Sequence, residues 1–292
     1  EPEIYTLPEM PPAEQPGSWW HEAGAWNHAG DPALWAEHNT RFAAFMEAWM
    51  TRDVEAIQTY LRPGWMPDAD NPEWEFSPLN NFYYMPGQKF VPQFDIQDYE
   101  EYPARATGND CFSANPSVND WYETVKLNYG VFYQGSGEKQ FDPIPDTWHK
   151  MLHILLFWAS KQVDGFRCDM AEMVPVEFWT WAIEQVKKEY PNILFIAEVY
   201  NPTLYRDYLA AGFDYLYDKV GMYDYLRGVT SKNWPAEGIT QQWQKVDDIR
   251  DRMLYFLENH DEQRIASGFF CGRGMCAEPA MIVAATLGTN PV

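Results

Sequence analysis

Three short, mostly apolar runs that each end in a carboxylate constrain the fold of this chain more than any other feature. They are Val163-Asp164-Gly165-Phe166-Arg167-Cys168-Asp169, Asn192-Ile193-Leu194-Phe195-Ile196-Ala197-Glu198 and Met253-Leu254-Tyr255-Phe256-Leu257-Glu258-Asn259-His260-Asp261. In parallel α/β sheets and barrels, catalytic groups lie at the carboxyl ends of the strands. The pattern therefore predicts three strands that deliver Asp169, Glu198 and Asp261 to one edge of a parallel sheet.

The segments around these runs have the spacing of helices. Apolar residues recur every three or four positions over residues 145–161 and 176–189, and shorter helices are expected over 202–211 and 277–287. A further strand is expected over residues 212–218. Asp169 and Glu198 lie 29 residues apart, about the length of one βαβ unit. We therefore expect these two carboxylates side by side on adjacent parallel strands.

Arg167 and Asp169 stand two positions apart at the end of the first run. Alternate residues of a strand share a face, so their side chains point the same way while Phe166 and Cys168 point the other way. A neighbouring positive charge favours the ionised form of a carboxylate, which is the form that a nucleophile needs. Asp169 is thus a candidate nucleophile, although a structural Arg–Asp pair at a strand end would leave the same pattern.

The three motifs together resemble those of the α-amylase family of glycoside hydrolases (family 13), in particular the amylase-like enzymes of Bacteroidetes. The residues that carry the resemblance are Gly165-Phe166-Arg167-Cys168-Asp169, Ala197-Glu198 and Asn259-His260-Asp261, in this order. The resemblance implies an α/β fold of the (β/α)₈ TIM-barrel type, with an irregular insertion called domain B. The barrel needs eight strands.

The resemblance also implies a role for each motif residue. Asp169 would be the nucleophile, Glu198 the general acid/base and Asp261 the residue that fixes the distorted sugar. Arg167 would keep Asp169 ionised, and His260 would donate a hydrogen bond to a sugar hydroxyl.

The long irregular stretch before the first helix fits the insertion. We expect a helical N-terminal segment over residues 1–62, with helices beginning near Asp31-Pro32, a domain-B-like insertion over 63–143 and the barrel portion over 144–292. Tyr84, in Asn80-Asn81-Phe82-Tyr83-Tyr84, is a candidate substrate-binding residue, as is the aromatic stretch 119–129. These aromatic residues would serve equally well as the core of the insertion.

The sequence departs from the family pattern in two places. The family's earliest motif, an Asp followed four and five positions later by Asn-His, was not found, and residues 1–62 do not look like three strand–helix units. An incomplete barrel is therefore expected. Glu172 and Met173 stand where many members have Lys and His. Calcium is common in the family, but one of its usual ligands belongs to the motif that is not found, so calcium stays open and no metal ligand is assigned.

The composition of the chain narrows the range of its possible binding partners. A net charge of −22 argues against nucleic acid and anionic membrane surfaces, and no apolar stretch reaches the roughly 18 to 20 residues that span a bilayer. The four cysteines are too few for a disulfide scaffold; Cys168 is expected behind its strand, and Cys271 and Cys276 fit either a loop disulfide or a reduced pair. We expect a periplasmic or secreted location rather than a cytoplasmic one.

The resemblance and these limits lead to one preferred function and two alternatives. The preferred function is a retaining hydrolase of α-1,4-linked glucans, with an α-glucan oligo- or polysaccharide as partner. The first alternative is a transglycosylase, in which a sugar hydroxyl replaces water. The second is a non-catalytic glycan-binding relic, which would have no need for both a nucleophile and an acid.

Overall fold

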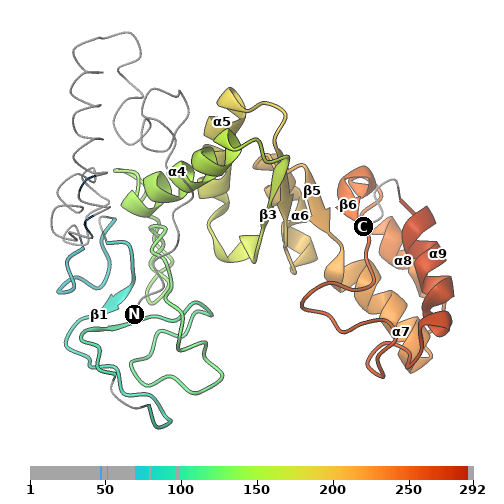
Figure 1. The fold of residues 1–292 in the computed structure, drawn as a ribbon, viewed down its shortest axis with the longest axis horizontal. Coiled ribbons are helices and arrows are strands. Elements are labelled where there is room, and N and C mark those ends of the chain that lie inside the picture. The colour runs from blue at the N-terminus through green and yellow to red at the C-terminus, as the bar shows by residue number, and fades with distance from the viewer. Residues whose placement is uncertain (1–46, 48–50, 52–69, 79, 97–98, 289–292) are drawn as a thin grey trace. The chain divides into compact units, whose positions relative to one another are not determined.

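The computed structural model describes residues 47, 51, 70–78, 80–96 and 99–288 of the 292-residue chain. It divides into two compact units, with the boundary between Gln162 and Val163 (Figure 1). The predicted N-terminal segment 1–62 and its helices over residues 31–61 lie outside the described residues, apart from the single positions 47 and 51. Each unit is described by itself.

The second unit is built on a parallel four-stranded sheet. Its strands are β3 (Gly165–Cys168), β4 (Leu194–Ala197), β5 (Tyr215–Tyr217) and β6 (Met253–Leu254), and they neighbour one another in chain order. Phe166 pairs with Phe195, Ile196 with Tyr215 and Leu216 with Met253. All four predicted strands are thus present and parallel, and the carboxyl ends of β3, β4 and β6 face the same edge.

The close approach of β3 and β4 explains why a glycine, Gly165, begins β3. A Cβ atom on Gly165 would lie 2.6 Å from the carbonyl oxygen of Leu194, which is its partner on β4. A side chain at this position would push the strands apart, so the pairing that aligns Asp169 with Glu198 favours glycine here.

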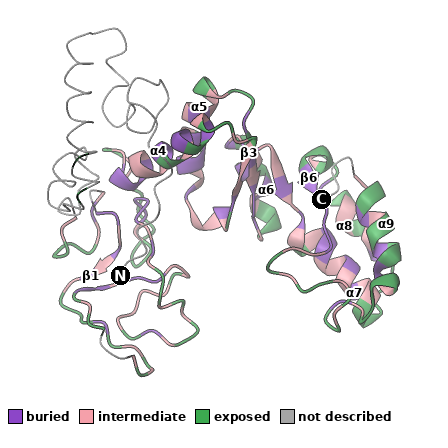
Figure 2. Ribbon diagram, viewed as in Figure 1, coloured by how far each residue is buried: buried purple, intermediate pink, exposed green. Residues whose placement is uncertain are grey.

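Helix α5 (Val176–Glu189) covers the sheet with the apolar stripe that the sequence predicts. Its buried residues are Phe178, Trp179, Ala182, Ile183 and Val186. Figure 2 shows buried and exposed parts of this helix in different colours. The Trp179 ring packs edge-on against Phe213, 5.1 Å between centroids, and Phe213 packs in turn against Phe195 of β4. Each such fully buried side chain contributes about 1.5–3 kcal/mol to stability. Glu177 in the first turn and Lys187 and Lys188 in the last turn complement the helix dipole.

The other helical segments of this unit follow the strands. They are 3₁₀ turns at Ala171–Met173, Pro202–Leu204, Arg250–Arg252 and Gly274–Ala277, a π-helical turn at Lys219–Tyr223, and helices α6 (Tyr205–Ala210), α7 (Asp224–Lys232), α8 (Gly238–Gln244) and α9 (Glu278–Thr286). The expected helices over 202–211 and 277–287 are therefore present, the first as a 3₁₀ turn continued by α6. Strand β6 is shorter than the predicted 253–257, although Tyr255, Phe256 and Leu257 are buried as the apolar run requires.

The first unit contains the predicted irregular insertion and a helix. Two short strands, β1 (Tyr84–Met85) and β2 (Ala104–Arg105), pair antiparallel, and Met85 and Ala104 from these strands form a small core with Phe90. Helix α4 (Asp146–Ser160) matches the helix predicted over 145–161. It groups with the first unit, whereas the sequence-based division places it with the barrel portion 144–292; that division stays a prediction.

No helix among the described residues is both long enough and apolar enough to span a membrane.

Candidate active site

One guanidinium joins the three carboxylates that end the apolar runs. Arg167, on β3, forms an ion pair with Asp169 through one terminal nitrogen, and its Nη2 lies 2.8 Å from Oε1 of Glu198 and 3.9 Å from Oδ2 of Asp261. Partial burial opposes its charge, but the hydrogen bond to Asp169 and the negative charge of Glu198 outweigh this and raise the pKa of Arg167. The guanidinium therefore stays charged at the meeting point of Asp169, Glu198 and Asp261.

Glu198 is the buried member of the three. Only 4% of the residue is exposed, whereas the side chains of Asp169 and Asp261 are 70% and 50% exposed. Its Oε2 accepts a hydrogen bond from the backbone N–H of Met170 at 3.0 Å, and its Oε1 accepts one from the Tyr200 hydroxyl at 3.2 Å. Burial and the negative charge of Glu198 raise the pKa of Tyr200 to about 12, so this hydroxyl remains a donor at neutral pH.

The backbone turns sharply after Asp169 in a way that serves Glu198. Met170 has φ +43°, in the left-handed region that non-glycine residues seldom adopt, and this turn directs its N–H at the Glu198 carboxylate. The N–H of Ala171 donates to the Glu198 carbonyl at 2.9 Å, and the Glu198 N–H donates to the Cys168 carbonyl at 3.1 Å. These two hydrogen bonds join the backbone at the end of β3 to the backbone at the end of β4.

Asp261 is held by a turn built on Asn259. The side-chain oxygen of Asn259 accepts hydrogen bonds from the N–H groups of Asp261 at 2.9 Å and Glu262 at 2.7 Å. Oδ2 of Asp261 lies 3.1 Å from Nε2 of His260, whose side chain is 68% exposed. His260 is therefore accessible to solvent beside Asp261.

A second positive charge, that of Lys219, holds the same loop at Glu262, the residue after Asp261. Nζ of Lys219 lies 2.9 Å from Oε1 of Glu262 and 3.0 Å from Oδ1 of Asp224, and the Tyr223 hydroxyl donates to Oε2 of Glu262 at 2.8 Å. The ammonium also lies 4.9 Å from the centre of the Tyr223 ring. We call these residues, Lys219, Tyr223, Asp224 and Glu262, the Lys219 cluster. It fixes the loop that carries Asp261 to the segment after β5.

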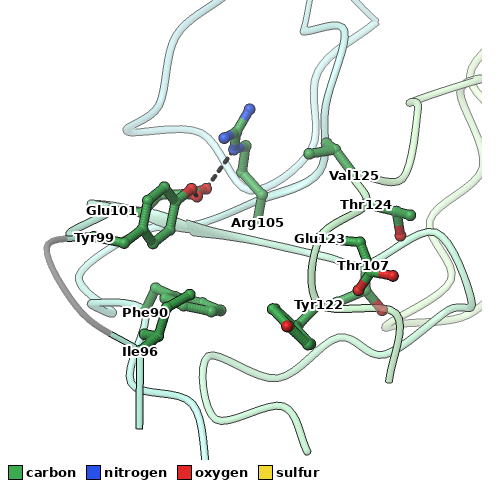
Figure 3. Close-up of a pocket in the computed structure, with 10 residues that line it drawn as sticks. All are labelled: Phe90, Ile96, Tyr99, Glu101, Arg105, Thr107, Tyr122, Glu123, Thr124 and Val125. Atoms are coloured by element: carbon green, nitrogen blue, oxygen red, sulfur yellow. Dashed lines mark hydrogen bonds and ion pairs between the residues drawn. The ribbon is translucent and has the colours of Figure 1, made fainter. Parts of the chain in front are cut away.

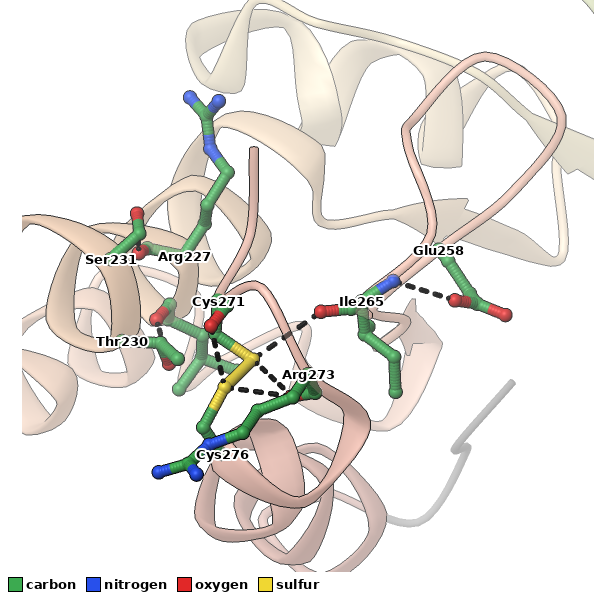
Figure 4. The surroundings of a disulfide bond; sticks show 9 residues. Arg227, Thr230, Ser231, Glu258, Ile265, Cys271, Arg273 and Cys276 are labelled. Atoms are coloured by element: carbon green, nitrogen blue, oxygen red, sulfur yellow. Dashed lines mark hydrogen bonds between the residues drawn. A yellow bond between two sulfur atoms is a disulfide. The ribbon is translucent and has the colours of Figure 1, made fainter. Parts of the chain in front are cut away.

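A disulfide bond forms a small ring in the chain just beyond this loop. Cys271 and Cys276 are joined, and the Cys271 sulfur lies 3.3 Å from the carbonyl oxygen of Ile265, as Figure 4 shows. The N–H of Ile265 donates to Oε2 of Glu258 at 2.9 Å. The sequence leaves open a loop disulfide or a reduced pair, and the structure has the disulfide. The bond lies at the end of the segment that runs from Glu258 to Cys271.

Tyr84 is not among the residues that the second unit brings together. It lies on β1 in the first unit, where its hydroxyl donates to Oδ2 of Asp70 at 2.9 Å. Nearby Tyr83 is buried and donates to the Val131 carbonyl at 2.6 Å, and Asn80 and Asn128 are buried as well. Of the two interpretations of these segments, the core of the insertion accounts for the buried members. A substrate contact of Tyr84 stays a prediction.

Two further expectations concern cysteine and metal. Cys168 is buried behind β3 as predicted, and burial raises the pKa of its thiol to about 12, so it is a packing residue rather than a nucleophile. No group of three or more His, Cys, Asp or Glu side chains in the described part of the chain is arranged to hold a metal ion. No described residue is therefore assigned as a metal ligand, and calcium stays open.

The sequence did not single out Tyr200, Met170 or the Lys219 cluster. Tyr200 and Glu262 each stand within two residues of a predicted carboxylate, and that proximity was the only available signal. Glu172, at a position that many family members fill with Lys, accepts a hydrogen bond from the N–H of Asn201 at 3.0 Å. Here it braces the loop after β4.

Comparisons with known proteins bear on the family and the fold of the chain. No family model matches the chain. The α-1,4-glucan:maltose-1-phosphate maltosyltransferase of Cereibacter sphaeroides is 28% identical over 136 residues, covering 44% of this chain and 21% of that enzyme. The enzyme of the same name from Picrophilus torridus is 36% identical over 106 residues, covering 36% of this chain and 15% of that enzyme. The matched parts thus span about a fifth or less of these relatives.

A solved structure supports the fold. The α-amylase from H. orenii superposes with a TM-score of 0.50 at 20% identity, covering 75% of this chain and 44% of that chain. Strands β3 to β6 and their helices are accordingly part of a TIM-type barrel, and the described residues supply four of its strands.

Proposed function

Because the chain belongs to the α-amylase family of glycoside hydrolases, we propose that it cleaves α-1,4-linked glucans by the retaining mechanism, through a covalent glycosyl-enzyme on Asp169. The observation that carries the proposal is the contact of Arg167 with Asp169, Glu198 and Asp261 at once. A guanidinium that contacts both Asp169 and Glu198 keeps their carboxyl groups close together. Retaining enzymes need a separation of about 5 to 5.5 Å, whereas inverting enzymes leave room for a water molecule between the two groups.

In the first step, an Asp169 oxygen attacks the anomeric carbon while the bond to the leaving oxygen breaks. Glu198 gives its proton to that oxygen and becomes a carboxylate. Asp169, largely exposed, is accessible to the sugar, and Glu198 is held by Tyr200 and the Met170 N–H. In the second step Glu198 takes a proton from the acceptor hydroxyl, whose oxygen attacks the anomeric carbon and releases Asp169.

Arg167 suits this cycle because the charge around it is conserved. Before the first step Asp169 is the anion beside the guanidinium; afterwards Asp169 is an ester and Glu198 is the anion, 2.8 Å from Nη2. The ion pair transfers from one terminal nitrogen to the other without a buried charge being left uncompensated, which would otherwise cost several kcal/mol. Asp261, beside Arg167, and His260, beside Asp261, would contact hydroxyls of the bound sugar.

Hydrolysis is the preferred outcome of the second step, with transfer to a sugar hydroxyl or phosphate as the second candidate. The relatives of 28% and 36% identity are maltosyltransferases by name, which favours keeping transfer under test.

The test separates the two carboxylates and the two acceptors. Wild type, Asp169→Asn and Glu198→Gln are assayed on maltoheptaose and on α-maltosyl fluoride, with Asp248→Asn, a surface residue paired with Arg206, as the matched control. We expect Asp169→Asn to lose turnover on both substrates, and Glu198→Gln to lose about 10²- to 10⁴-fold on maltoheptaose but to retain the fluoride reaction, because fluoride leaves without a proton. Equal losses on both substrates for both variants would contradict the assigned roles.

Product analysis then decides the acceptor. Shorter oligosaccharides alone indicate hydrolysis. Glucans longer than the substrate, or maltose 1-phosphate formed with added inorganic phosphate, indicate transfer. Binding without turnover in wild type would leave the glycan-binding alternative.

A further inference from the structure

The insertion in the first unit contains a pocket of about 310 Å³ that no step of the proposed reaction uses. Figure 3 shows aromatic rings on two of its sides and an ion pair along another. The residues on which the argument rests are Phe90, Tyr99, Glu101, Arg105, Tyr122 and Glu123. All belong to the unit that ends at Gln162, so the pocket is built without any of the three carboxylates.

The aromatic sides of the pocket are held by other rings. Phe90 is buried in the small core of the insertion, and Tyr99 packs edge-on against it at 5.6 Å between centroids. Opposite them, Tyr122 packs against Phe94 at 4.3 Å and against the same core. Rings fixed in this way present apolar faces at little entropic cost, and the C–H faces of a pyranose ring are their natural partners.

The polar side of the pocket is a charged pair with capacity for further hydrogen bonds. Glu101 is paired with Arg105 and accepts a hydrogen bond from the Tyr99 hydroxyl. The guanidinium lies 5.2 Å from the centre of the Phe82 ring, which supports it from behind. A carboxylate accepts several hydrogen bonds and a guanidinium donates five, so the pair offers both kinds of partner to adjacent hydroxyl groups.

The balance of charge selects against anionic ligands. The lining carries two carboxylates, Glu101 and exposed Glu123, and one guanidinium, Arg105, which is already neutralised by Glu101. A phosphate or carboxylate entering the pocket would meet a negative surplus. The ligand that fits apolar ring faces, mixed hydrogen-bonding groups and this charge is a neutral sugar.

We propose that this pocket is an accessory sugar site that binds a short neutral α-glucan unit, separate from the site of bond cleavage. The choice of α-glucan rests on the proposed function; the choice of a neutral sugar rests on the pocket alone. Its volume lies at the small end of the range for ligand sites, which suits a mono- or disaccharide unit rather than a long chain. Such a site would hold one part of a polysaccharide on the insertion.

The test uses the full chain with Asp169→Asn, which binds without turnover, and maltotriose as the probe in calorimetric titrations. Tyr122→Leu removes the ring but keeps an apolar side chain over the core, and Arg105→Met removes the charged donor. Trp74→Leu, an exposed tryptophan of the same unit outside the pocket, is the matched control. We expect two binding phases, one of which weakens about tenfold in each pocket variant and is unchanged in the control.

A second readout covers any variant that folds poorly. In the Asp169→Asn chain, the methyl resonances of Ile96 and Val125, which line the pocket, should shift with maltotriose. Maltose 1-phosphate should shift them less than maltose at equal concentration, because it is anionic. Unchanged methyl resonances, unchanged binding in both pocket variants, or stronger binding of the phosphorylated sugar would each overturn the accessory site.

The outcomes distinguish this inference from the proposed function. If wild type turns over maltoheptaose but the pocket variants bind maltotriose as Asp169→Asn does, the accessory site is wrong and the catalytic assignment stands. If wild type turns over no glucan but Tyr122→Leu removes a binding phase, the accessory site stands and the catalytic assignment fails.

Discussion

Nη2 of Arg167 lies 2.8 Å from Oε1 of Glu198, while the other terminal nitrogen of the same guanidinium contacts Asp169. One residue thus compensates the charge of both carboxylates that the proposed reaction alternates between. A lysine ammonium is a single point charge and does not present two nitrogens in a fixed plane.

Arg167→Lys should therefore lower kcat by about 10²-fold or more, since a misplacement of about 1 Å in a catalytic group has an effect of this size. The measurement is kcat and KM on maltoheptaose, with circular dichroism to check folding. Arg206→Lys, which alters an exposed pair with Asp248, is the control and should leave both constants unchanged. Full activity of Arg167→Lys would show that the planar contact to the carboxylates is not needed.

The Lys219 cluster gives a second prediction. Lys219→Met would leave Glu262 and Asp224 as partly buried carboxylates without their shared cation and would loosen the loop that carries Asp261. We expect kcat to fall about tenfold or more, with recovery in Lys219→Arg. Lys187→Met, which removes a similarly buried pair with Asp214 elsewhere in the unit, is the control. It should lower the melting temperature and spare kcat; an equal effect of both variants on kcat would argue against a positioning role.

Two tyrosines in the second unit make a matched pair for stability. The Tyr255 hydroxyl is buried without a hydrogen-bond partner among the described residues, whereas the Tyr208 hydroxyl donates to the Val174 carbonyl at 3.0 Å. Tyr255→Phe should raise the free energy of unfolding by about 1 kcal/mol at pH 7, and Tyr208→Phe should lower it by about 1 kcal/mol. Urea unfolding of both variants measures this directly.

Tyr255 also predicts how the stability of the protein depends on pH. Burial raises the pKa of Tyr255 to about 12, while an unfolded tyrosine loses its proton near pH 10. Between these values the folded state keeps a proton that the unfolded chain has lost. The free energy of unfolding of wild type is therefore independent of this phenol below pH 10 and falls as pH rises from 10 through 12. The advantage of Tyr255→Phe over wild type should therefore grow by about 2 kcal/mol across this window. A constant advantage would show that the phenol titrates alike in both states.

The disulfide should stabilise the loop beyond Asp261. Replacing both Cys271 and Cys276 by Ser should lower the free energy of unfolding by about 2 kcal/mol, which is the loop-closure entropy of so short a ring. Adding dithiothreitol should lower the melting temperature of wild type toward that of the double variant and leave the variant unaffected. Cys111→Ser, at a free and partly exposed cysteine, should change neither value. A wild-type melting temperature insensitive to reductant would contradict this prediction.

The strands and helices of the second unit could be predicted from the sequence because local periodicity determines them. The buried stripe of α5 follows from apolar spacing, and Pro175 marks the start of the helix near Val176. The three carboxylates could be placed together because parallel strands end at one edge. The strand over 253–257 came out shorter than predicted, since an apolar run shows burial but not where ladder pairing stops.

The supports of the candidate site could not be predicted in this way. The hydrogen bond from the Met170 N–H to Glu198 depends on a left-handed residue at a position with no glycine to mark it. The contact of Lys219 with Glu262 joins residues far apart in sequence, and no spacing rule links them. In the insertion, aromatic composition alone did not distinguish the buried ring of Tyr83 from the exposed ring of Tyr99, because irregular backbone has no period to define a face.

The order of the strands has a consequence for how the site assembles. Since β3, β4, β5 and β6 neighbour one another in chain order, β4, β5 and β6 each pair with the strand made just before them, and no pairing has to wait for a strand made later. A chain synthesised from its N-terminus can therefore join Arg167 to Glu198 as soon as β4 has left the ribosome, while Asp261 is still untranslated. The two carboxylates of the proposed charge exchange form the early half of the candidate site, and Asp261, which we propose to hold the sugar, is the last to arrive.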